Sequence, residues 1–379
     1  MVFVLAAVLA ASNVGRGLAR AREPGALGDL ATRAAEYELF RAGVYPNGAI
    51  AGRKGARYTV YPPYALPMFA VFFEPGGFLQ GVVLVELASL VSLGVIGSYG
   101  ARELRFAGPA LASVGALATG AIAGVVGCLW VGQFSLLCVA LIVTQIVCLD
   151  RGRGGVAGLC WALAMLKPQI ALAFAPLFMR DRQWRGLVVG GLVLAGLSLL
   201  ACWWTGLSPW RVAHHWMFRE SLTWTGKGGT FGPGKLAEAV GLKPRDVQLA
   251  SLAACGAVGA VALWILRRRL SSVDLLPLAG ACGLLGELLF YHRSYDHVML
   301  APAVFAVLAR VAALPTPTSV ALAVLVPGSV WMPSRFIEGL PHARLAMAAI
   351  WGVAAVVLVA WAFRVSPRRP ADAVTGSAA

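Results

Sequence analysis

Long runs of apolar residues, separated by short arginine-rich loops, are the feature that most limits how this chain can fold. A helix needs about 20 apolar residues to cross a bilayer, and runs 78–98, 108–130 and 344–363 reach that length. Apolar residues make up 59% of the 379-residue chain and charged residues only 13%, against roughly 45–50% and about 25% in soluble domains. The sequence therefore predicts an all-α, polytopic integral membrane protein.

The arginine-rich loops predict how the chain crosses the membrane, because short loops rich in lysine and arginine stay on the cytoplasmic side. These loops are 99–106, 150–155, 180–185, 267–270 and 363–370. If all are inside, the apolar runs cross in pairs: 108–130 with 133–149, 186–206 with 248–266, 272–291 with 298–314, and 318–332 with 344–363. We expect about eleven to twelve crossings in one membrane domain spanning 1–379, with both termini inside. Two long outer loops, 13–63 and 207–247, and a cytoplasmic tail, 365–379, complete the map.

The formal net charge of +15 has a topological explanation. The basic residues lie in short loops between apolar runs, so membrane orientation and binding of anionic lipids explain them better than binding of nucleic acid. All seven cysteines lie inside apolar segments, which predicts buried free thiols rather than disulfides or a zinc site. The first apolar run, 1–12, lacks the basic start of a signal peptide and is short for a span, so we expect a shallow or truncated first helix.

Lys167 and Pro168 interrupt the apolar run between loops 150–155 and 180–185. Both ends of this run are predicted to be cytoplasmic, although its length suits a single span, and proline breaks a helix. We expect two short helices that meet at Lys167 and line a cavity within the protein; a single span with one misassigned loop is the alternative. A lysine at this depth costs about 2.5–3.5 kcal/mol on insertion scales, so Lys167 needs an anionic partner or a wet cavity.

Asp29 heads an early polar stretch. Leu30, Ala34, Tyr37 and Phe40 follow it near helical spacing, which predicts an amphipathic helix at the membrane surface. From the residues alone, the favoured role of Asp29 is to cap the free backbone N–H groups at the helix start. A capping carboxylate is rigidly held, so this role is compatible with catalysis.

Other candidate groups gather on the predicted outer side. Tyr61, ahead of two prolines, suits an interfacial anchor or a ring that stacks on a sugar, and Gln133 places an amide in a tight turn that needs no ligand. Glu86 and Glu287 lie within apolar runs as structural or functional acids. All five histidines fall on this side, which an outward-facing catalytic surface would explain: His214, His215, His292, His297 and His342. Their spacing supports no metal site.

Taken in order, these motifs resemble glycosyltransferase family 87, within the GT-C superfamily of integral membrane glycosyltransferases, over most of the chain. The matching residues are Asp29, Ala34, Ala35, Leu39, Gly43 and Tyr45; then Tyr61-Pro62-Pro63, Gly132-Gln133, Ala157-Gly158, Lys167-Pro168 and Tyr295-Asp296-His297. The chain departs from the family pattern in its short first run and in Thr32 and Arg33, where a tyrosine is usual.

The resemblance implies an inverting transferase that takes a sugar, most often α-linked mannose, from a polyprenyl-phosphate donor to a lipid or glycan acceptor. The reaction would occur at the outer face of the cell membrane and use no cofactor, with divalent-metal dependence open. Asp29 would be the general base, while cations stabilise the departing phosphate. The other substrate-binding candidates are Lys167, Arg293 and His297 for the phosphate, and Asp296, His292, Gln133, Tyr61, His214 and His215 around the substrates.

Three other functions remain open at this stage. A secondary transporter would have inverted repeats and midplane polar groups, but no repeat is evident and the polar groups share one face. An O-antigen polymerase or ligase would have its key residues late in the chain, leaving Asp29 unused. A structural membrane protein would not need Lys167 at depth. The glycine-rich stretch 226–235 lacks the serine or threonine of a nucleotide-binding loop, so we expect a flexible outer loop.

Overall fold

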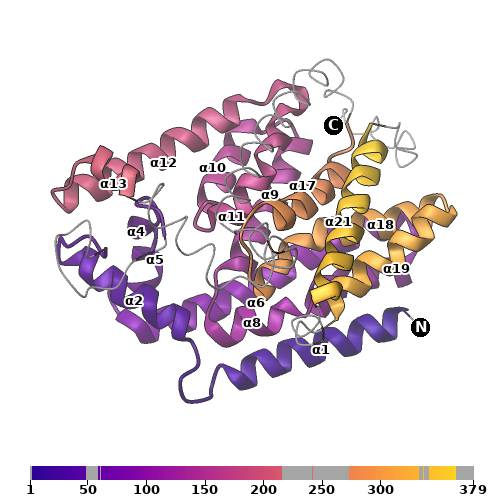
Figure 1. Cartoon of the computed structure of the whole chain (residues 1–379), viewed down its shortest axis with the longest axis horizontal. Helices are drawn as coiled ribbons and strands as arrows, with labels where there is room; N and C mark the ends of the chain where they lie inside the picture. Colours follow the sequence, from indigo (N-terminus) through magenta and orange to yellow (C-terminus); the bar gives the residue numbers. More distant parts are fainter. Residues whose placement is uncertain are drawn as a thin grey trace, which may run out of the picture.

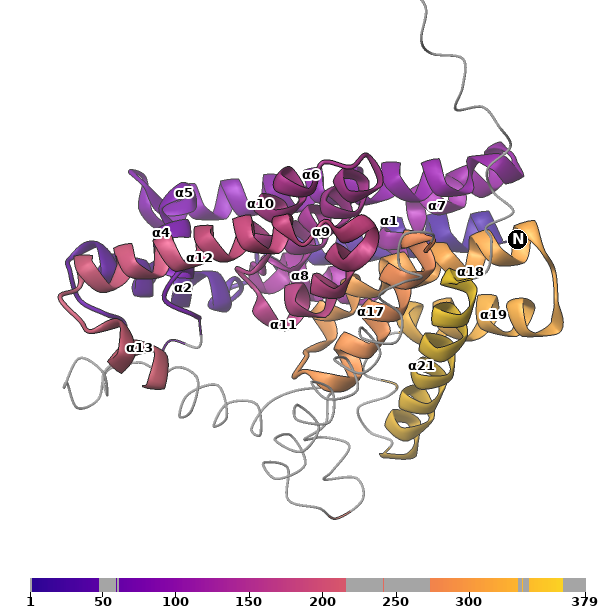
Figure 2. The same ribbon diagram turned by 90° about the horizontal axis from the view of Figure 1, so that it is seen from above.

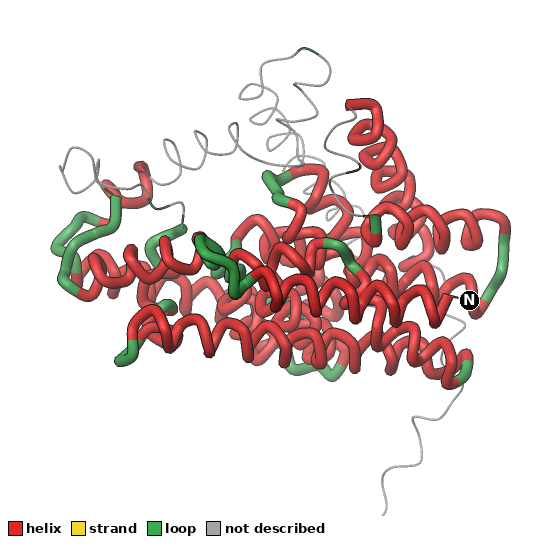
Figure 3. Tube along the Cα trace, turned by 90° about the horizontal axis from the view of Figure 1, so that it is seen from below, coloured by secondary structure: helices red, strands yellow, loops and turns green. Residues whose placement is uncertain are grey.

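The computed structural model describes residues 2–47, 59, 61–215, 241, 273–332, 336 and 341–363. Every regular element in this part of the chain is a helix, which confirms the all-α class (Figures 1 and 3). Several predicted features lie outside the described residues: the run 248–266, the loop 267–270, the stretch 226–235, the tail 365–379, Cys255 and most of the loop 207–247. The six cysteines that are described are buried and free.

Short connections join many of the described helices, whereas most of 48–60 and 216–272 lies outside the description. In chain order they are α1 (Val2–Arg20), α2 (Gly28–Arg41), α4 (Ala65–Met68), α5 (Ala70–Phe73), α6 (Gly77–Leu104), η1 (Arg105–Ala107), α7 (Pro109–Ala121), α8 (Gly124–Val131), α9 (Ser135–Asp150), α10 (Gly154–Ala164), α11 (Pro168–Ala171), η2 (Leu172–Arg182), α12 (Arg185–Trp204), α13 (Pro209–His215), α17 (Leu275–Leu289), η5 (Ser294–Leu300), α18 (Ala301–Ala313), α19 (Pro317–Trp331) and α21 (Pro341–Ala362). The η elements are 3₁₀ helices.

The described residues contain 5 helices that are long and apolar enough to cross a membrane, or up to 6 if the bent pair α7 and α8 counts as one span. Four shorter apolar helices, α9, α10, α17 and α19, coincide with other predicted runs. Large apolar side chains such as Val91, Leu192 and Val356 are exposed on the long helices, as expected for surfaces in contact with lipid. The chain is therefore a multi-pass membrane protein, and the total of about eleven to twelve crossings stays a prediction.

The start of the chain differs from the sequence-based expectation. The first helix continues to Arg20 and is long enough to span, so residues 13–20 are helix rather than part of the first outer loop. Asn13 explains the difference. Its side chain is buried, and its amide donates to the carbonyl oxygens of Gly120, Ala121 and Ile122 at 3.2, 3.0 and 3.3 Å. A polar residue that appeared to end the run is satisfied by a distant part of the chain.

Helices α6, α9 and α12 share a common arrangement, with one end at an arginine-rich segment and the other near an aromatic cluster. The expected loop 99–106 is helical, since it forms the end of α6 and part of η1; 150–155 joins α9 to α10, and 180–185 runs from the end of η2 into α12. At the opposite ends, the Phe134 ring lies 5.8 Å from that of Phe69 and 4.9 Å from that of Phe72. The Trp204 indole donates to the Phe40 carbonyl at 2.8 Å. Helices α2, α4, α5 and α13 lie together at this second end (Figures 1 and 2).

Glycines hold α10 and α12 close together. A Cβ atom at Gly158 would collide with the carbonyl oxygen of Gly186, and one at Gly190 would lie 2.8 Å from the carbonyl oxygen of Gly158. Small residues allow this approach between membrane helices. The contact fixes the direction in which α10 delivers the chain to Lys167.

We therefore predict that Gly158→Ala destabilises the protein by about 1–3 kcal/mol, the usual cost of overpacking. The measurement is thermal unfolding of the purified protein in detergent. Gly191→Ala is the matched control, because a Cβ atom at Gly191 meets nothing within 4 Å. Equal stability of the two variants would contradict the proposed contact.

Candidate functional site

Asp29 lies in the first turn of α2, and its carboxylate faces other parts of the protein. The helix is capped at Leu27 without a side-chain hydrogen bond, so the expectation that Asp29 caps the helix is wrong. Its Oδ2 instead accepts hydrogen bonds from the Gln133 amide and, at 3.4 Å, from the Tyr295 hydroxyl. The carboxylate is half-buried. It is held by groups from two distant parts of the sequence.

The turn between α8 and α9 accounts for this orientation. Gly132 has a φ of 70°, a conformation that glycine adopts without steric cost, and a Cβ atom there would lie 2.7 Å from the Leu30 Cβ. The Leu27 N–H donates to the Trp130 carbonyl at 3.0 Å. Helix α2 therefore starts directly against the turn, which brings Gln133 to Asp29. The tight turn at Gly132 is thus required for this contact.

Lys167 lies in the break between α10 and α11, which confirms the interrupted helix and makes the single-span alternative wrong. Its Nζ donates to the Asp296 Oδ1 and to the Ser135 Oγ, both at 2.7 Å. The Ser135 hydroxyl also donates to the Asp296 Oδ1 at 2.8 Å. The Lys167 and Asp296 side chains are only 3% and 1% exposed. The anionic partner that a lysine at this depth requires is Asp296.

Tyr295 connects the buried ion pair to Asp29. The Lys167 Nζ lies 4.5 Å from the centroid of the Tyr295 ring, within the range of a cation–π interaction. The hydroxyl of the same tyrosine reaches Asp29. Asp29 and Lys167 therefore contact the same side chain, Tyr295, although 138 positions separate them in the sequence (167 minus 29).

Arg33 and Tyr61 border this cluster. The Arg33 guanidinium lies 4.6 Å from the centroid of the Tyr61 ring, and its Nη1 lies 2.6 Å from the Glu36 Oε2. Burial raises the pKa of Tyr61 to about 12, and the positive charges of Lys167 and Arg33 oppose part of this shift. Tyr61 thus lies within electrostatic reach of both cations. Arg33 covers one face of this ring, for which an interfacial anchor and a platform for a sugar were the two expected roles.

Arg293 lies on the accessible side of the cluster. Its side chain is exposed, and its Nε donates to the Tyr291 hydroxyl at 3.0 Å. Partial burial works against the charged form, but the bond to Tyr291 and the nearby Tyr295 and Asp29 side chains outweigh it and raise the pKa of Arg293. A permanent, exposed cation therefore lies near Asp29.

The two histidines of this region face the protein interior. The buried His292 has its Nε2 3.1 Å from the Gly286 carbonyl oxygen and its Nδ1 3.7 Å from the Asp296 Oδ2. The buried His297 has its Nε2 3.8 Å from the Glu287 Oε2, and its ring meets that of Trp351 edge-on at 5.5 Å. Both lie on the Asp296 side of the cluster, so the structure gives no support to His297 as an exposed phosphate ligand.

The remaining histidines lie elsewhere. His214 is exposed on α13, at the same end of the molecule as α2 and α4 (Figures 1 and 2), and His342 is exposed at the start of α21. The His215 side chain is outside the description. Within the described ranges, no group of three or more His, Cys, Asp and Glu residues could hold a metal ion.

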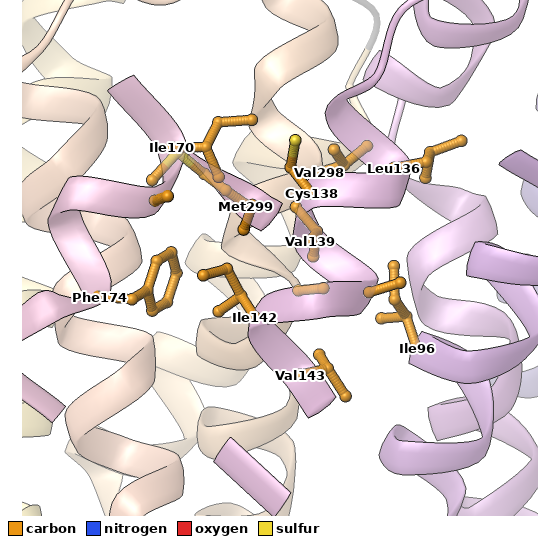
Figure 4. Packing of buried hydrophobic residues seen from close by; sticks show 14 of the residues in the cluster. Ile96, Leu136, Cys138, Val139, Ile142, Val143, Ile170, Phe174, Val298 and Met299 are labelled. Atoms are coloured by element: carbon orange, nitrogen blue, oxygen red, sulfur yellow. The ribbon is translucent and has the colours of Figure 1, made fainter. Parts of the chain in front are cut away.

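A packed apolar layer supports the cluster. Figure 4 shows Leu136 and Val139 of α9 beside Val298 of η5, with Ile170 and Phe174 facing α9 from the chain after Lys167. These side chains are buried, and each segment directly adjoins a polar member of the cluster. The layer fixes the relative positions of Ser135, Lys167 and Asp296.

The family model of glycosyltransferase family 87 matches residues 58–291, more than half of the chain. The chain belongs to glycosyltransferase family 87. No curated protein and no solved structure matches it. The chain is therefore a membrane glycosyltransferase, and the transporter, polymerase and structural alternatives lose their support. Asp29 and η5 lie outside the matched segment, so it is the geometry that joins them to Gln133 and Lys167 of this family 87 protein.

The sequence predicted no role for Ser135, and it pointed to Tyr295 only as part of the Tyr295-Asp296-His297 motif. The available signal for Ser135 was a hydroxyl at the start of an apolar helix, two positions after Gln133. Glu287 proves to be the neighbour of His297. Glu86 lies on α6 without a recorded contact to this cluster among the described residues.

We predict that Lys167→Met destabilises the fold by about 3–5 kcal/mol, because it leaves the Asp296 carboxylate buried without its cation. The double variant Lys167→Met/Asp296→Asn should recover most of the loss. Thermal unfolding in detergent measures both. Arg41→Met is the control, since its pair with Glu38 is exposed and such pairs contribute about 0–1 kcal/mol. A lone Lys167→Met as stable as that control would contradict the pairing.

Proposed function

We propose that this family 87 protein transfers a hexose, mannose in the first instance, from a polyprenyl-phosphate donor to a hydroxyl of a lipid or glycan acceptor. The reaction inverts the anomeric configuration and takes place at the non-cytoplasmic face of the cell membrane, in the manner of a GT-C enzyme. The observation that carries this proposal is the Asp29 carboxylate, half-buried and held by Gln133 and Tyr295 beside an exposed arginine.

Asp29 is the general base of the proposed reaction. Both hydrogen bonds that the described residues give to its carboxylate go to Oδ2, which leaves Oδ1 for the acceptor hydroxyl. The acceptor oxygen attacks the anomeric carbon while its proton passes to Asp29. The bond between the anomeric carbon and the donor phosphate oxygen breaks at the opposite side, so polyprenyl phosphate leaves and the configuration inverts.

Arg293 is the preferred partner for the departing phosphate. Negative charge grows on the phosphate as the bond breaks, and a fixed cation stabilises that charge most in the transition state. An arginine can bind phosphate through two parallel hydrogen bonds. Arg293 is exposed and near Asp29, whereas Lys167 is already paired with Asp296. Gln133 and Tyr61 remain candidates for contacts with the sugar, as do His214 and His215 at the same end.

The arrangement of helices supports the proposed side of the membrane. The arginine-rich loops lie at one end of α6, α9, α10 and α12, and Ser135, Lys167 and Gln133 lie near their other ends. Helix α9 has 16 residues and is therefore about 24 Å long, somewhat shorter than a hydrocarbon core of about 30 Å. Trp203, Trp204 and Trp210 are exposed at the second end, as in an interfacial aromatic belt. If the arginine loops are cytoplasmic, the cluster faces outward.

The catalytic proposal is tested with membranes supplied with radiolabelled polyprenyl-phosphate mannose and, in parallel, with other lipid-linked sugars. We predict that Asp29→Asn lowers transfer by at least about 10²-fold, at the lower end of what general base catalysis contributes, at unchanged protein level. Glu38→Gln, on the same helix but exposed and paired with Arg41, should retain full transfer. Full activity of Asp29→Asn, or no transfer by the unaltered protein from any donor, would rule the proposal out.

The proposed orientation is tested by labelling intact cells with a membrane-impermeant maleimide. We predict that Glu38→Cys is labelled and Arg151→Cys is not, because the proposed orientation puts the exposed Glu38 of α2 outside and the exposed Arg151 of an arginine-rich loop inside. The unaltered chain is the control, since its six described cysteines are buried. Labelling of Arg151→Cys but not Glu38→Cys would reverse the orientation.

A further inference from the structure

We propose that Lys167, Ser135 and Asp296 are positioning residues that fix Tyr295 against Asp29, and that Lys167 does not bind the donor phosphate. This inference rests on the proposed function, in which Asp29 is the base. It differs from the expectation drawn from the family resemblance, which placed Lys167 at the phosphate.

The donors of Lys167 are already engaged. Two of its contacts, to Asp296 and Ser135, are each 2.7 Å long, and the ammonium also faces the Tyr295 ring. Asp296 is equally occupied: its Oδ1 accepts from Lys167 and Ser135, and its Oδ2 accepts from the Arg293 backbone N–H at 3.3 Å. A phosphate bound to Lys167 would separate it from Asp296. The Asp296 carboxylate would then lose its cation and lie beside a second anion, which is energetically unfavourable in a buried site.

Tyr295 is held from three directions. Lys167 contacts its ring, and the Cys128 thiol donates to its backbone carbonyl at 3.2 Å. Helix α8 also approaches it through glycines: a Cβ atom at Gly127 would lie 3.1 Å from the Tyr295 Cβ, and one at Gly124 would collide with the Ser294 carbonyl oxygen. The ring, the backbone and the Cβ atom of Tyr295 are thus each restrained by a separate contact.

The restraint on Tyr295 fixes the contact between its hydroxyl group and Asp29. The Tyr295 hydroxyl is 3.4 Å from the Asp29 Oδ2, longer than the usual O–H···O hydrogen bond of about 2.5–3.0 Å, so a small displacement of the ring breaks the contact. A carboxylate held on one oxygen presents the other in a fixed direction, and misplacing a reacting group by about 1 Å can cost about 10²-fold in rate. The buried ion pair therefore acts on the base through Tyr295.

The test is a mutant cycle between Tyr295→Phe and the neutralised pair Lys167→Met/Asp296→Asn, assayed with purified protein and polyprenyl-phosphate mannose. We expect each change to lower kcat by about 10- to 100-fold with the KM for the donor within about twofold. The triple variant should be no slower than either parent, because both changes remove the same restraint. A raised donor KM with kcat retained, or effects that multiply in the triple variant, would overturn the inference.

A milder variant keeps the test decisive if the neutralised pair does not fold. In Gly127→Ala the nearest atoms to the new Cβ all belong to Tyr295, its Cβ first at 3.1 Å, and we expect a several-fold loss of kcat with unchanged donor KM and unchanged Tm. Gly191→Ala, in open space, should match the unaltered protein. Full kcat in Gly127→Ala would count against the restraint on Tyr295.

The same preparation separates this inference from the proposed function. Asp29→Asn should be inactive in it. If Asp29→Asn is inactive but the effects of the cycle multiply, only the positioning role of Lys167 fails. If Asp29→Asn is active, the proposed function itself fails.

Discussion

The ion pair between Lys167 and Asp296 is the interaction on which the rest of this structure depends. A charge buried in a membrane protein must be compensated, and here an ammonium and a carboxylate, each almost fully buried, compensate each other. The pair joins the break after α10 to η5, and Ser135 adds the start of α9 to the same point. Three segments that are distant in the sequence are thus fixed together on an apolar layer formed by their own neighbours (Figure 4).

A second set of polar groups, more accessible than the ion pair, contacts it through Tyr295. Tyr295 contacts Lys167 on one side and Asp29 on the other, and Gln133 holds the same carboxylate from the turn before α9. The two sets of groups differ in burial and in pairing, and their proposed roles differ accordingly. Groups that are buried and mutually paired set positions, whereas the half-buried Asp29 and the exposed Arg293 remain able to meet a substrate. This division explains why the deep lysine and the exposed arginine, both cations near one acid, have different proposed roles.

Sequence alone predicted the features that follow from hydrophobic periodicity and from proline. The break at Lys167-Pro168 and the amphipathic helix after Asp29 are confirmed, because both depend on local chemistry. Features set by distant contacts were missed. Asn13 appeared to end the first helix until Gly120 and its neighbours satisfied it, and Asp29 appeared to be a cap because Gln133 and Tyr295 could not be placed beside it. The inward orientation of His297 and the role of Ser135 also depend on tertiary packing that no local pattern records.

The most direct test of this account is a structure of the protein with a non-transferable donor analogue, such as a polyprenyl phosphonate sugar, and an acceptor. The quantities to measure are the distance from Asp29 to the acceptor oxygen and the distances from the phosphonate to Arg293 and Lys167. The account predicts a carboxylate oxygen of Asp29 about 3 Å from the acceptor hydroxyl, the phosphonate against Arg293, and Lys167 still paired with Asp296. A phosphonate that displaces Asp296 from Lys167, or an acceptor hydroxyl that meets a different carboxylate, would contradict it.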